Sequence, residues 1–425
     1  MKVLVIGKGG REHALVWKLA QSPRKPKIYC APGNAGTLRQ ATNVPIEPTE
    51  LDKLLRFARD EKIDLTIVGP EDPLAMGIVD LFEKSNFRIF GPNKEGAQLE
   101  SSKVFAKNLM RDANIPTGEF KVFDHPGPAK TYIESREYPV VVKADGLAAG
   151  KGVIVCSTRE EACSAVDRIM SREEFGRTAG RQIVIEKRLE GEELSVLAIV
   201  GGHTIVPLQP CQDHKPAFDG DKGPNTGGMG AYSPARLAKP DLLEQIDRDV
   251  LVPTVHALHK IDRKFNGILY AGLMLTNQGV RVLEYNTRFG DPETQPLLVR
   301  LKTDLLDLIE AVVDNRLDEV VGKGLEWDPR PAVCVVLAAK GYPGPYEKGM
   351  PLDGLDQASR VPGVTIFHAG TRIWNNQLLG DGGRVLGFTA LGETVQDARR
   401  AAYAAIEQID CAHFYYRKDI ALRGV

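Results

Sequence analysis

Long apolar runs are missing from this sequence. Runs such as LSVLAIV at residues 194–200 are far shorter than the roughly 20 apolar residues that a membrane-spanning helix needs. The chain opens with MKVLVIG, whose single lysine and four consecutive apolar residues suit a first β-strand better than a secretory signal. We therefore expect a globular protein with no membrane partner.

An excess of charge of either sign is also missing, because 55 basic and 56 acidic residues leave a formal net charge of −1. That balance does not favour a nucleic-acid groove or a polybasic surface, so any anion site must be local. The six cysteines include no C-x-x-C pair and show no zinc spacing with the eight histidines. We expect free thiols in a reducing cytosol, which predicts a cytoplasmic location.

What the sequence does contain is an alternation of strands and helices. Apolar runs at residues 2–7, 27–30, 64–70 and 87–92 are separated by segments with helical spacing. This order predicts a parallel sheet with helices on both faces. Further runs predict a small compact unit in mid-chain and a last α+β domain, so the chain is a multidomain α/β and α+β protein. HPGPA at residues 125–129 is interpreted as a loop.

The stretch VVKADGLAAGKGV at residues 141–153 resembles a phosphate-binding loop but is not a Walker A motif. Gly146 and Gly150 are one residue too close, and Lys151 is followed by Gly152 where a hydroxyl residue should bind magnesium. Lys143 ends a strand and Lys151 lies in the loop, so both lysines can close over a polyphosphate. The alternative is a β-hairpin with surface lysines, but five small residues favour close approach of a ligand.

GKGGREH at residues 7–13 begins like a dinucleotide fingerprint, but Glu12 stands where the third glycine should be. Gly9 and Gly10 still open a helix N-terminus with Arg11 beside it. Exposed amides, the helix dipole and a guanidinium suit a phosphate monoester. A tight turn that needs glycine only for its shape explains this stretch equally well.

The stretch VRVLEYNTRFGDPETQ at residues 280–295 predicts a metal site. Glu284 and Asn286 are two residues apart on a strand and share a face, and Arg288 continues that face. Carboxylate and carboxamide oxygens suit Mg²⁺ bridged to phosphates. The alternative is an edge strand with its polar face in water. The uneven apolar pattern instead suggests burial on both sides, where polar groups need partners.

Two more stretches are candidates only in combination with these motifs. IVIEKRLEGEELS at residues 183–195 contains a strand ending in Glu186, followed by Leu189 and Glu193. The strand end can present backbone groups to an adenine edge, and a nearby carboxylate can take ribose hydroxyls. Residues 213–230 form a long glycine-rich loop, and loops of that length in a compact domain are usually functional.

Four stretches together resemble the glycinamide ribonucleotide synthetase family of ATP-grasp enzymes. They are APGNAGT at 31–37, VVKADGLAAGKGV at 141–153, the QDHK and DGDKGPNTGGMGAY block at 212–232, and RFGDPETQ at 288–295. The resemblance covers essentially the whole chain. It implies a Rossmann-like N-terminal domain at 1–103, an ATP-grasp core at 104–326 with a mobile small lobe at about 121–190, and a C-terminal α+β domain at 327–425.

The resemblance also implies roles for individual residues. The ATP contacts it implies are Lys103, Lys143, Gly150, Lys151 and Gly152 at the phosphates and Glu186, Leu189 and Glu193 at adenine and ribose. The metal ligands, for Mg²⁺ or Mn²⁺, are Glu284 and Asn286, and the catalytic groups are Lys143, Lys151 and Arg288. The substrate residues are Gly9, Gly10, Arg11, Asn34 and Gly36 at a 5′-phosphate, Asp213 at an ammonium, Arg288 at a carboxylate, and Lys215, Asn225, Thr226, Gly227, Gly290 and Asp291 nearby.

The reaction that the resemblance implies joins glycine to 5-phosphoribosylamine at the expense of ATP, through glycyl phosphate, in a monomer or weak homodimer. One departure is the strand at 269–276, which lacks an acid that many ATP-grasp enzymes use as a metal ligand. Three alternatives remain: another ATP-grasp ligase, an NAD-dependent dehydrogenase built on GKGGREH, and an inactive nucleotide-binding regulator.

Overall fold

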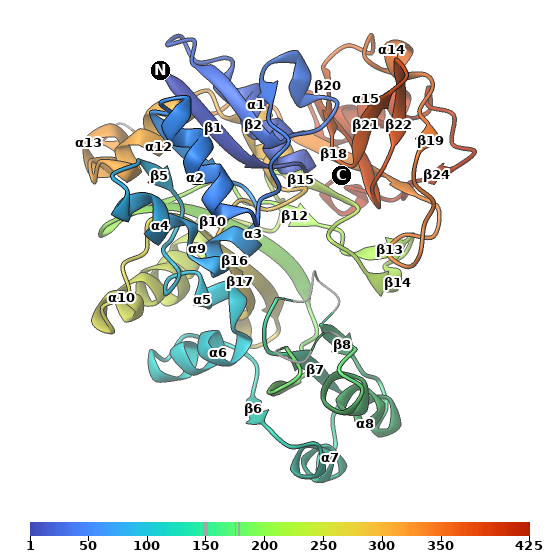
Figure 1. Ribbon diagram of the computed structural model, residues 1–425. Coiled ribbons are helices and arrows are strands. Elements are labelled where there is room, and N and C mark those ends of the chain that lie inside the picture. Colours follow the sequence, from blue (N-terminus) through green and yellow to red (C-terminus); the bar gives the residue numbers. More distant parts are fainter. Residues whose placement is uncertain (148–151, 175, 177–178, 323) are drawn as a thin grey trace.

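The computed structural model describes residues 1–147, 152–174, 176, 179–322 and 324–425, and its N-terminal part is a parallel sheet (Figure 1). The strands lie in the order β3-β2-β1-β4-β5, and neighbours along this order are parallel. Their bounds are β1 Lys2–Gly7, β2 Lys27–Pro32, β3 Thr42–Asn43, β4 Leu65–Val68 and β5 Ile89–Phe90. The predicted α/β domain is therefore confirmed.

Both faces of this sheet are covered, which explains why β1 is apolar without alternation. Val3 and Val5 of β1 pack in one core with helix α1, whereas Leu4 and Ile6 pack in another with α2 and α4. The helices are α1 Gly10–Leu19, α2 Leu51–Asp60, α3 Glu71–Met76 and α4 Ile78–Lys84. A short 3₁₀ turn, η1 Thr37–Arg39, follows β2.

A small lobe, built on β6 to β9, projects from the body of the molecule at the bottom of Figure 1. The helices α5 Gln98–Ser101 and α6 Lys103–Asp112 lead into it. Its sheet has the order β6-β9-β7-β8, with strands β6 Phe120–Phe123, β7 Val140–Ala144, β8 Val153–Val155 and β9 Ile183–Lys187. The helices α7 Pro126–Glu134 and α8 Arg159–Val166, which continues as the π-turn η2 Asp167–Ser171, pack on it.

The interpretation of residues 125–129 as a loop is wrong, because α7 begins at Pro126. Proline has no amide hydrogen, and the first turn of a helix leaves its amides without helical partners, so proline is tolerated there. His125 is the N-cap residue in an extended conformation. The proline and glycine that suggested a loop therefore mark a helix start.

A second sheet, antiparallel, has the order β11-β10-β16-β17. Its strands are β10 Glu192–Gly201, β11 Thr204–Pro207, β16 Gly267–Thr276 and β17 Gly279–Asn286, and two hairpins close as Gly201↔Thr204 and Thr276↔Gly279. The associated helices are α9 Pro240–Ile246, the π-turn η3 Asp247–Leu251, α10 Val252–Lys260, α11 Thr294–Arg300, α12 Leu305–Val313 and α13 Leu317–Val321.

β17 carries a bulge that sets the direction of its polar side chains. Val282 pairs with Leu273 and Glu284 pairs with Gly272, so Leu283 is the extra residue. The bulge keeps Val282 and Tyr285 in the same core although they are three residues apart. Glu284 and Asn286 then share the opposite, partly exposed face. The uneven apolar pattern in the sequence thus reflects the bulge.

The C-terminal sheet takes in two strands from the middle of the chain. Its order is β12-β15-β18-β23-β20, with β24 also pairing with β18. The strands are β12 Gln212–Asp213, β15 Gly230–Ser233, β18 Ala332–Ala339, β20 Val364–His368, β23 Arg384–Leu391 and β24 Phe414–Tyr415. Helix α15 Val395–Ile406 packs on β18 and β23. The glycine-rich loop between β12 and β15 is therefore anchored at both ends in the C-terminal sheet.

The remaining elements are short. The order β19-β22-β21 forms a separate small sheet, with β19 Met350–Pro351, β21 Thr371–Trp374 and β22 Gln377–Gly380, and α14 Leu355–Ala358 and the 3₁₀ turn η4 Leu422–Gly424 complete the domain. The hairpin β13 Pro216–Phe218 and β14 Lys222–Asn225 lies within the glycine-rich loop. All six cysteines are unpaired. Within the described residues, no helix combines the length and apolar character needed to cross a membrane.

Candidate active site

Two lysines share one buried carboxylate where the small lobe meets the body. Glu186 on β9 pairs with Lys107 of α6, and its Oε2 lies 2.6 Å from Nζ of Lys143 on β7. Burial raises the pKa of Glu186, but Lys143 and Lys107 outweigh this effect and hold it below its ordinary value. Burial also lowers the pKa of Lys107 to about 8. The Glu186 carboxylate, predicted to bind ribose or adenine, is thus occupied by lysines.

A second lysine predicted at ATP phosphates lies at the start of α6. Lys103 donates from Nζ to the carbonyl oxygen of Gly146, at 3.2 Å. Asp145 accepts from the hydroxyl of Ser102 at 3.0 Å and from the backbone amide of Val104 at 3.1 Å, so it fixes the start of the glycine loop on the helix. Burial lowers the pKa of Lys103, because the nearby carboxylates only partly offset the removal of its charge from water.

Glu284 is the carboxylate on which the lysines converge. Nζ of Lys215 lies 3.4 Å from its Oε1 and 3.5 Å from Oε2 of Glu193. The charge of Lys215, with those of Lys143 and Lys103, lowers the pKa of Glu284 to about 2 although burial opposes the shift. Lys143 also donates to the carbonyl oxygen of the bulged residue Leu283, at 3.1 Å. Three lysines from different elements therefore surround the predicted metal ligand.

Arg288 lies beside Asn286, as predicted, but its donors already have partners. Nη2 donates to Oδ1 of Asn286 at 3.0 Å and lies 2.8 Å from Oε1 of Glu100, and Nε donates to Oε2 of Glu71 at 3.2 Å. Glu100 is fixed in turn by the amide of Thr287, at 2.7 Å. Nothing in the sequence around Glu71 and Glu100 distinguishes them, because they reach Arg288 from other elements.

Asp213 lies in a buried acidic pocket. Its Oδ1 accepts from the amide of His214 at 2.6 Å. Burial, and then the charge of Glu293, raise the pKa of Asp213 well above its ordinary value. The hydroxyl of Tyr270 donates to Oε1 of Glu293 at 2.5 Å and contacts Ser195 at 2.9 Å. The charge of Lys215 does not offset the burial and repulsion that raise the pKa of Asp213. A cation between the two buried carboxyls is therefore favourable. Sequence reasoning missed Glu293 and Tyr270.

The glycine-rich loop closes on the base of its own hairpin. Both the amide and the hydroxyl of Thr226 donate to the carbonyl oxygen of Lys215, at 2.9 and 2.7 Å. Asn225 pairs with Pro216 in the exposed hairpin. Gly227 is bound by side chains of the C-terminal domain. The loop thus brings Lys215 and Thr226 together, with Asp213 at its start.

The N-terminal turn is organised by Glu12. Its Oε2 accepts from the amide of Gly9 at 2.5 Å and its Oε1 accepts from Nε of Arg11 at 2.6 Å. A Cβ on Gly7 or Gly69 would lie 2.4 or 2.1 Å from Glu12 atoms. The Glu12 side chain therefore fills the space that a dinucleotide-binding turn leaves open, which argues against the dehydrogenase alternative.

The other predicted residues of this region also have partners. The amide of Arg11 donates to Oδ2 of Asp291 at 3.4 Å, and a Cβ on Gly10 would meet Gln295 at 2.6 Å. Asn34 accepts at Oδ1 from the amide of Gly36, at 2.9 Å. The carbonyl oxygen of Gly290 accepts from the hydroxyl of Thr294 at 2.5 Å. These contacts tie the turn to the segment that carries Asp291.

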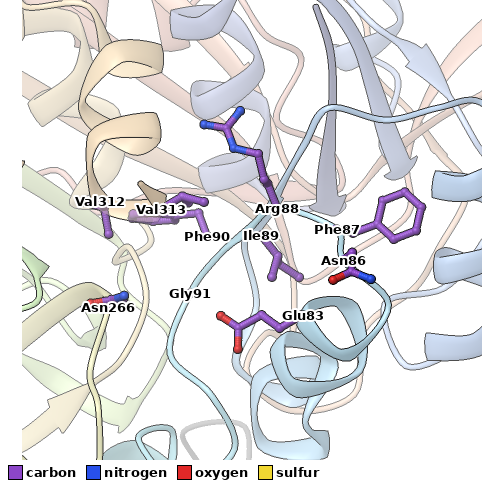
Figure 2. Close-up of a pocket in the computed structure, with 10 residues that line it drawn as sticks. All are labelled: Glu83, Asn86, Phe87, Arg88, Ile89, Phe90, Gly91, Asn266, Val312 and Val313. Carbon is purple, nitrogen blue, oxygen red and sulfur yellow. The ribbon is translucent and has the colours of Figure 1, made fainter. Parts of the chain in front are cut away.

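Parts of the prediction fall outside these clusters. Gly150 and Lys151 lie outside the described residues, whereas the carbonyl oxygen of Gly152 accepts from the amide of Ala144 at 2.8 Å. Leu189 is half-buried in the segment after β9. A cavity of about 310 Å³ near β5 and α12, shown in Figure 2, contains none of the predicted site residues. Its Arg88 is held by Glu310 and Asp314.

Comparison with known proteins identifies the family. Family models described as the N, ATP-grasp (A) and C domains of phosphoribosylglycinamide synthetase match residues 1–100, 101–294 and 332–423. The chain belongs to the phosphoribosylglycinamide synthetase family. This is the family that the sequence motifs resemble under the name glycinamide ribonucleotide synthetase, so the resemblance is confirmed.

Similar members of the phosphoribosylglycinamide synthetase family share the whole length of the chain. The phosphoribosylamine–glycine ligase of Rhodopirellula baltica is 52% identical and covers 99% of this chain and 97% of the relative. The crystal structure of the same ligase from Thermotoga maritima is 36% identical, with a TM-score of 0.83, and covers 99% of this chain and 100% of that one.

A more distant structure shows the shared fold alone. The biotin carboxylase domain of 2-oxoglutarate carboxylase from Hydrogenobacter thermophilus, in complex with MgADP, ADP and bicarbonate, is 16% identical. Its TM-score is 0.72, and the match covers 99% of this chain and 92% of that chain. Together with the ATP-grasp (A) family model over residues 101–294, this likeness confirms the predicted ATP-grasp fold.

Proposed function

We infer that the protein is an ATP-dependent ligase that joins glycine to 5-phosphoribosylamine and forms glycinamide ribonucleotide, ADP and phosphate in de novo purine biosynthesis. Family membership supports the reaction, and one observation in the site carries it: Nζ of Lys215 lies 3.4 Å from Oε1 of Glu284, and the charges of Lys143 and Lys103 act on the same carboxylate. Lysines brought together from separate segments suit a polyphosphate, whose charge they neutralise.

We propose that ATP binds between the small lobe and the body. Lys103 and Lys143 contact its phosphates, and the glycine loop with Gly150, Lys151 and Gly152 covers them. The segment after β9, with Leu189, contacts adenine, and the partly exposed Glu193 takes ribose hydroxyls. Glu186 acts through the lysines that it binds, because its carboxylate lies between Lys107 and Lys143. Phosphate oxygens then replace Glu186 as partners of Lys143.

Glu284 and Asn286 fit a divalent cation bound to the same phosphates. Both present oxygen atoms on one face of β17, and Mg²⁺ or Mn²⁺ needs few protein ligands when phosphates and water supply the rest. Within the described residues, no group of three or more His, Cys, Asp or Glu side chains forms a separate metal cage. When bound, the ion would neutralise phosphate charge, and it would replace Lys215 as the partner of Glu284.

We propose that glycine binds beside Asp213. The two buried carboxyls of Asp213 and Glu293 attract its ammonium group, and the raised pKa of Asp213, caused by burial and then by the charge of Glu293, supports a cation there. Arg288 takes the carboxylate, which requires exchange of one of its acidic partners, Glu71 or Glu100. Lys215 and Thr226 border the same space. Asn225, Gly227 and Gly290 support it through their backbone positions.

The 5-phosphoribosylamine site is proposed at the N-terminal turn. We expect Gly9, Gly10, Arg11, Asn34 and Gly36 to border the phosphate, and the amide of Arg11 reaches Asp291. A 5′-phosphate there would compete with Glu12 for the guanidinium of Arg11. We expect a monomer or a weak homodimer. The cytoplasmic location stays a prediction.

The chemistry follows from the poor reactivity of a carboxylate towards amines. A carboxylate oxygen of glycine attacks the γ-phosphorus of ATP, the bond to the bridging oxygen breaks, and ADP leaves with that electron pair. The amine of 5-phosphoribosylamine then attacks the carbonyl carbon of glycyl phosphate, and phosphate leaves. The lysines stabilise the charge that develops on the transferred group. Closure of the small lobe would exclude water from the acyl phosphate.

The direct test is ADP release with Mg-ATP, glycine and freshly generated 5-phosphoribosylamine, with each substrate omitted in turn. We expect release to require all three, and we expect Glu284→Ala to reduce the rate by about a hundredfold or more, as loss of a charged active-site group does. Arg281→Ala, on the same strand, should retain the rate, since Arg281 only donates to a neighbouring carbonyl. Equal release with another carboxylate would contradict the assignment of glycine.

A further inference from the structure

The tip of the glycine-rich loop, residues 226–228, is held by two side chains of the C-terminal domain. Arg384 is the first residue of β23, next to a bulge in its pairing with β18. Tyr342 lies in the turn that follows β18. Neither residue belongs to the motifs that indicate the active site, and both reach it from more than a hundred residues away along the chain.

Arg384 binds two segments of the site at once. Its Nη1 donates to the carbonyl oxygen of Gly227 at 2.7 Å, to that of Asp291 at 2.6 Å, and more weakly to that of Gly228 at 3.4 Å. The same nitrogen lies 3.5 Å from Oδ1 of Asp291. One guanidinium thus joins the glycine-rich loop to the segment that begins with Asp291.

Tyr342 binds the backbone of Gly227 as well. Its hydroxyl accepts from the amide of Gly227 at 3.1 Å, while Arg384 binds the carbonyl oxygen of that residue. Gly383 lets the two side chains approach, because a Cβ there would lie 2.3 Å from the Tyr342 ring. A Cβ on Gly227 would likewise lie 3.0 Å from the guanidinium carbon. The close fit fixes the position of Gly227.

The other side of the loop faces the proposed glycine pocket. A Cβ on Gly228 would lie 2.9 Å from Oδ1 of Asp213 and 2.4 Å from Pro292. The hydroxyl of Thr226 accepts from the amide of Gly228 at 2.9 Å and donates to the carbonyl oxygen of Lys215 at 2.7 Å. A displacement at Gly227 is therefore transmitted to Asp213 and to Lys215.

We propose that Arg384, assisted by Tyr342, is a positioning residue that sets the glycine-rich loop and Asp291 in register for binding of the amino-acid substrate. This rests on the proposed function for the reaction, but the positioning of the loop can be measured without turnover. The C-terminal domain then contributes to substrate binding through residues that need not touch the substrate. ATP binding is set by other elements and is independent of Arg384.

The test compares Arg384→Ala, Arg384→Lys and Tyr342→Phe with the control Arg372→Ala, whose arginine pairs with Asp381 on the exposed small sheet. In Arg384→Ala we expect kcat/KM for glycine to fall about a hundredfold, since charge-assisted hydrogen bonds to two segments are lost. Tyr342→Phe should lose about fivefold, as for a single hydrogen bond. The KM for ATP should stay within about twofold. Added guanidinium ion should partly restore Arg384→Ala.

Amide hydrogen exchange supplies the readout that does not depend on activity. The peptide containing residues 222–232 should exchange faster than in the wild type in both Arg384 variants and in Tyr342→Phe. Its exchange rate should be unchanged in Arg372→Ala. If these variants exchange faster but the wild-type enzyme shows no ligase activity, the positioning role of Arg384 is supported and the proposed ligase reaction is contradicted. An active wild type whose Arg384→Lys and Tyr342→Phe variants keep both normal exchange and normal kcat/KM for glycine would overturn the proposal.

Discussion

Glu186 shows how a single buried residue prepares the site for a polyanion. Its side chain and that of Lys107 are each 2% exposed, and Lys143 is 7% exposed. Buried charges are tolerated when they are paired, and two lysines against one carboxylate leave an excess of positive charge. That excess is a cost of the nucleotide-free state, and it is relieved when a phosphate reaches Lys143. We therefore interpret Lys107 as the permanent partner of Glu186.

The substitution Lys107→Met tests this interpretation. Glu186 would then have only Lys143 as a partner, and its carboxylate would hold Lys143 away from phosphate. We expect the KM for ATP to rise about tenfold and the free energy of unfolding to fall by about 2–3 kcal/mol, below the loss for a buried charge left with no partner. Nucleotide titration and chemical denaturation measure the two effects.

The matched control is Lys53→Met, which removes an exposed lysine paired with Glu50. Exposed pairs contribute about 0–1 kcal/mol, so the control should change stability little and leave the KM for ATP unaltered. A normal KM for ATP in a folded Lys107→Met protein would contradict the role assigned to Lys107.

Among the elements, β17 and α1 place the polar groups of the site. The bulge at Leu283 turns Glu284 and Asn286 to one face while Val282 and Tyr285 stay in the core. At the start of α1, the carboxylate of Glu12 is enclosed by Gly7 and Gly69. Both arrangements depend on backbone positions that a larger side chain would disturb.

Gly69→Ala should therefore be destabilising, because its Cβ would lie 2.1 Å from Oε1 of Glu12. We expect a loss of about 1–3 kcal/mol, as for overpacking of a close-packed interior. Gly127→Ala is the control: no atom lies within 4 Å of its Cβ, and it sits in helix α7, where alanine gains about 0.5–1 kcal/mol. Equal stability of the two variants in thermal melts would contradict the close fit around Glu12.

The sequence predicted local elements better than the contacts between them. The apolar runs of β1 and β4 and the polar face of Glu284 and Asn286 follow from local periodicity. HPGPA was misread because proline and glycine mark a helix start as well as a loop. Glu71, Glu293 and Arg384 were missed because their partners come from distant segments, and no local pattern encodes such pairings.

At the scale of the whole molecule, the N- and C-terminal domains meet at buried histidines. Nδ1 of His13 on α1 accepts from the amide of His368 on β20, at 2.8 Å. The side-chain amide of Asn34 donates to the carbonyl oxygen of His368, also at 2.8 Å. The turn proposed to bind 5-phosphoribosylamine is thus fixed to the domain that supplies Arg384. The blue and red domains of Figure 1 lie side by side at this contact.

Buried histidines, two at this interface and His214 in the glycine-rich loop, predict a loss of stability in mild acid. Burial, with the charge of His368, lowers the pKa of His13 to about 3, and burial lowers the pKa values of His214 and His368 to about 4. These histidines stay neutral in the folded protein below pH 6.5, whereas the unfolded chain binds protons there. The free energy of unfolding should fall from pH 6.5 to 4.5, by at most about 1.4 kcal/mol per pH unit for each histidine.

Denaturation at several pH values measures this slope. His13→Gln should make it shallower, because glutamine does not titrate. His125→Gln should leave it unchanged, since His125 is exposed beside Asp124. A wild-type slope that is flat between pH 6.5 and 4.5 would contradict the neutral state of the buried histidines.

The central claim is that the carboxylate of glycine is activated by the γ-phosphoryl group of ATP. The most direct measurement uses glycine labelled with ¹⁸O in its carboxylate and follows the label into inorganic phosphate by mass spectrometry. The glycyl phosphate mechanism predicts one ¹⁸O atom in each phosphate released, because the carboxylate oxygen that attacks phosphorus leaves with it. Turnover that yields unlabelled phosphate would contradict a glycyl phosphate intermediate and the mechanism built on it.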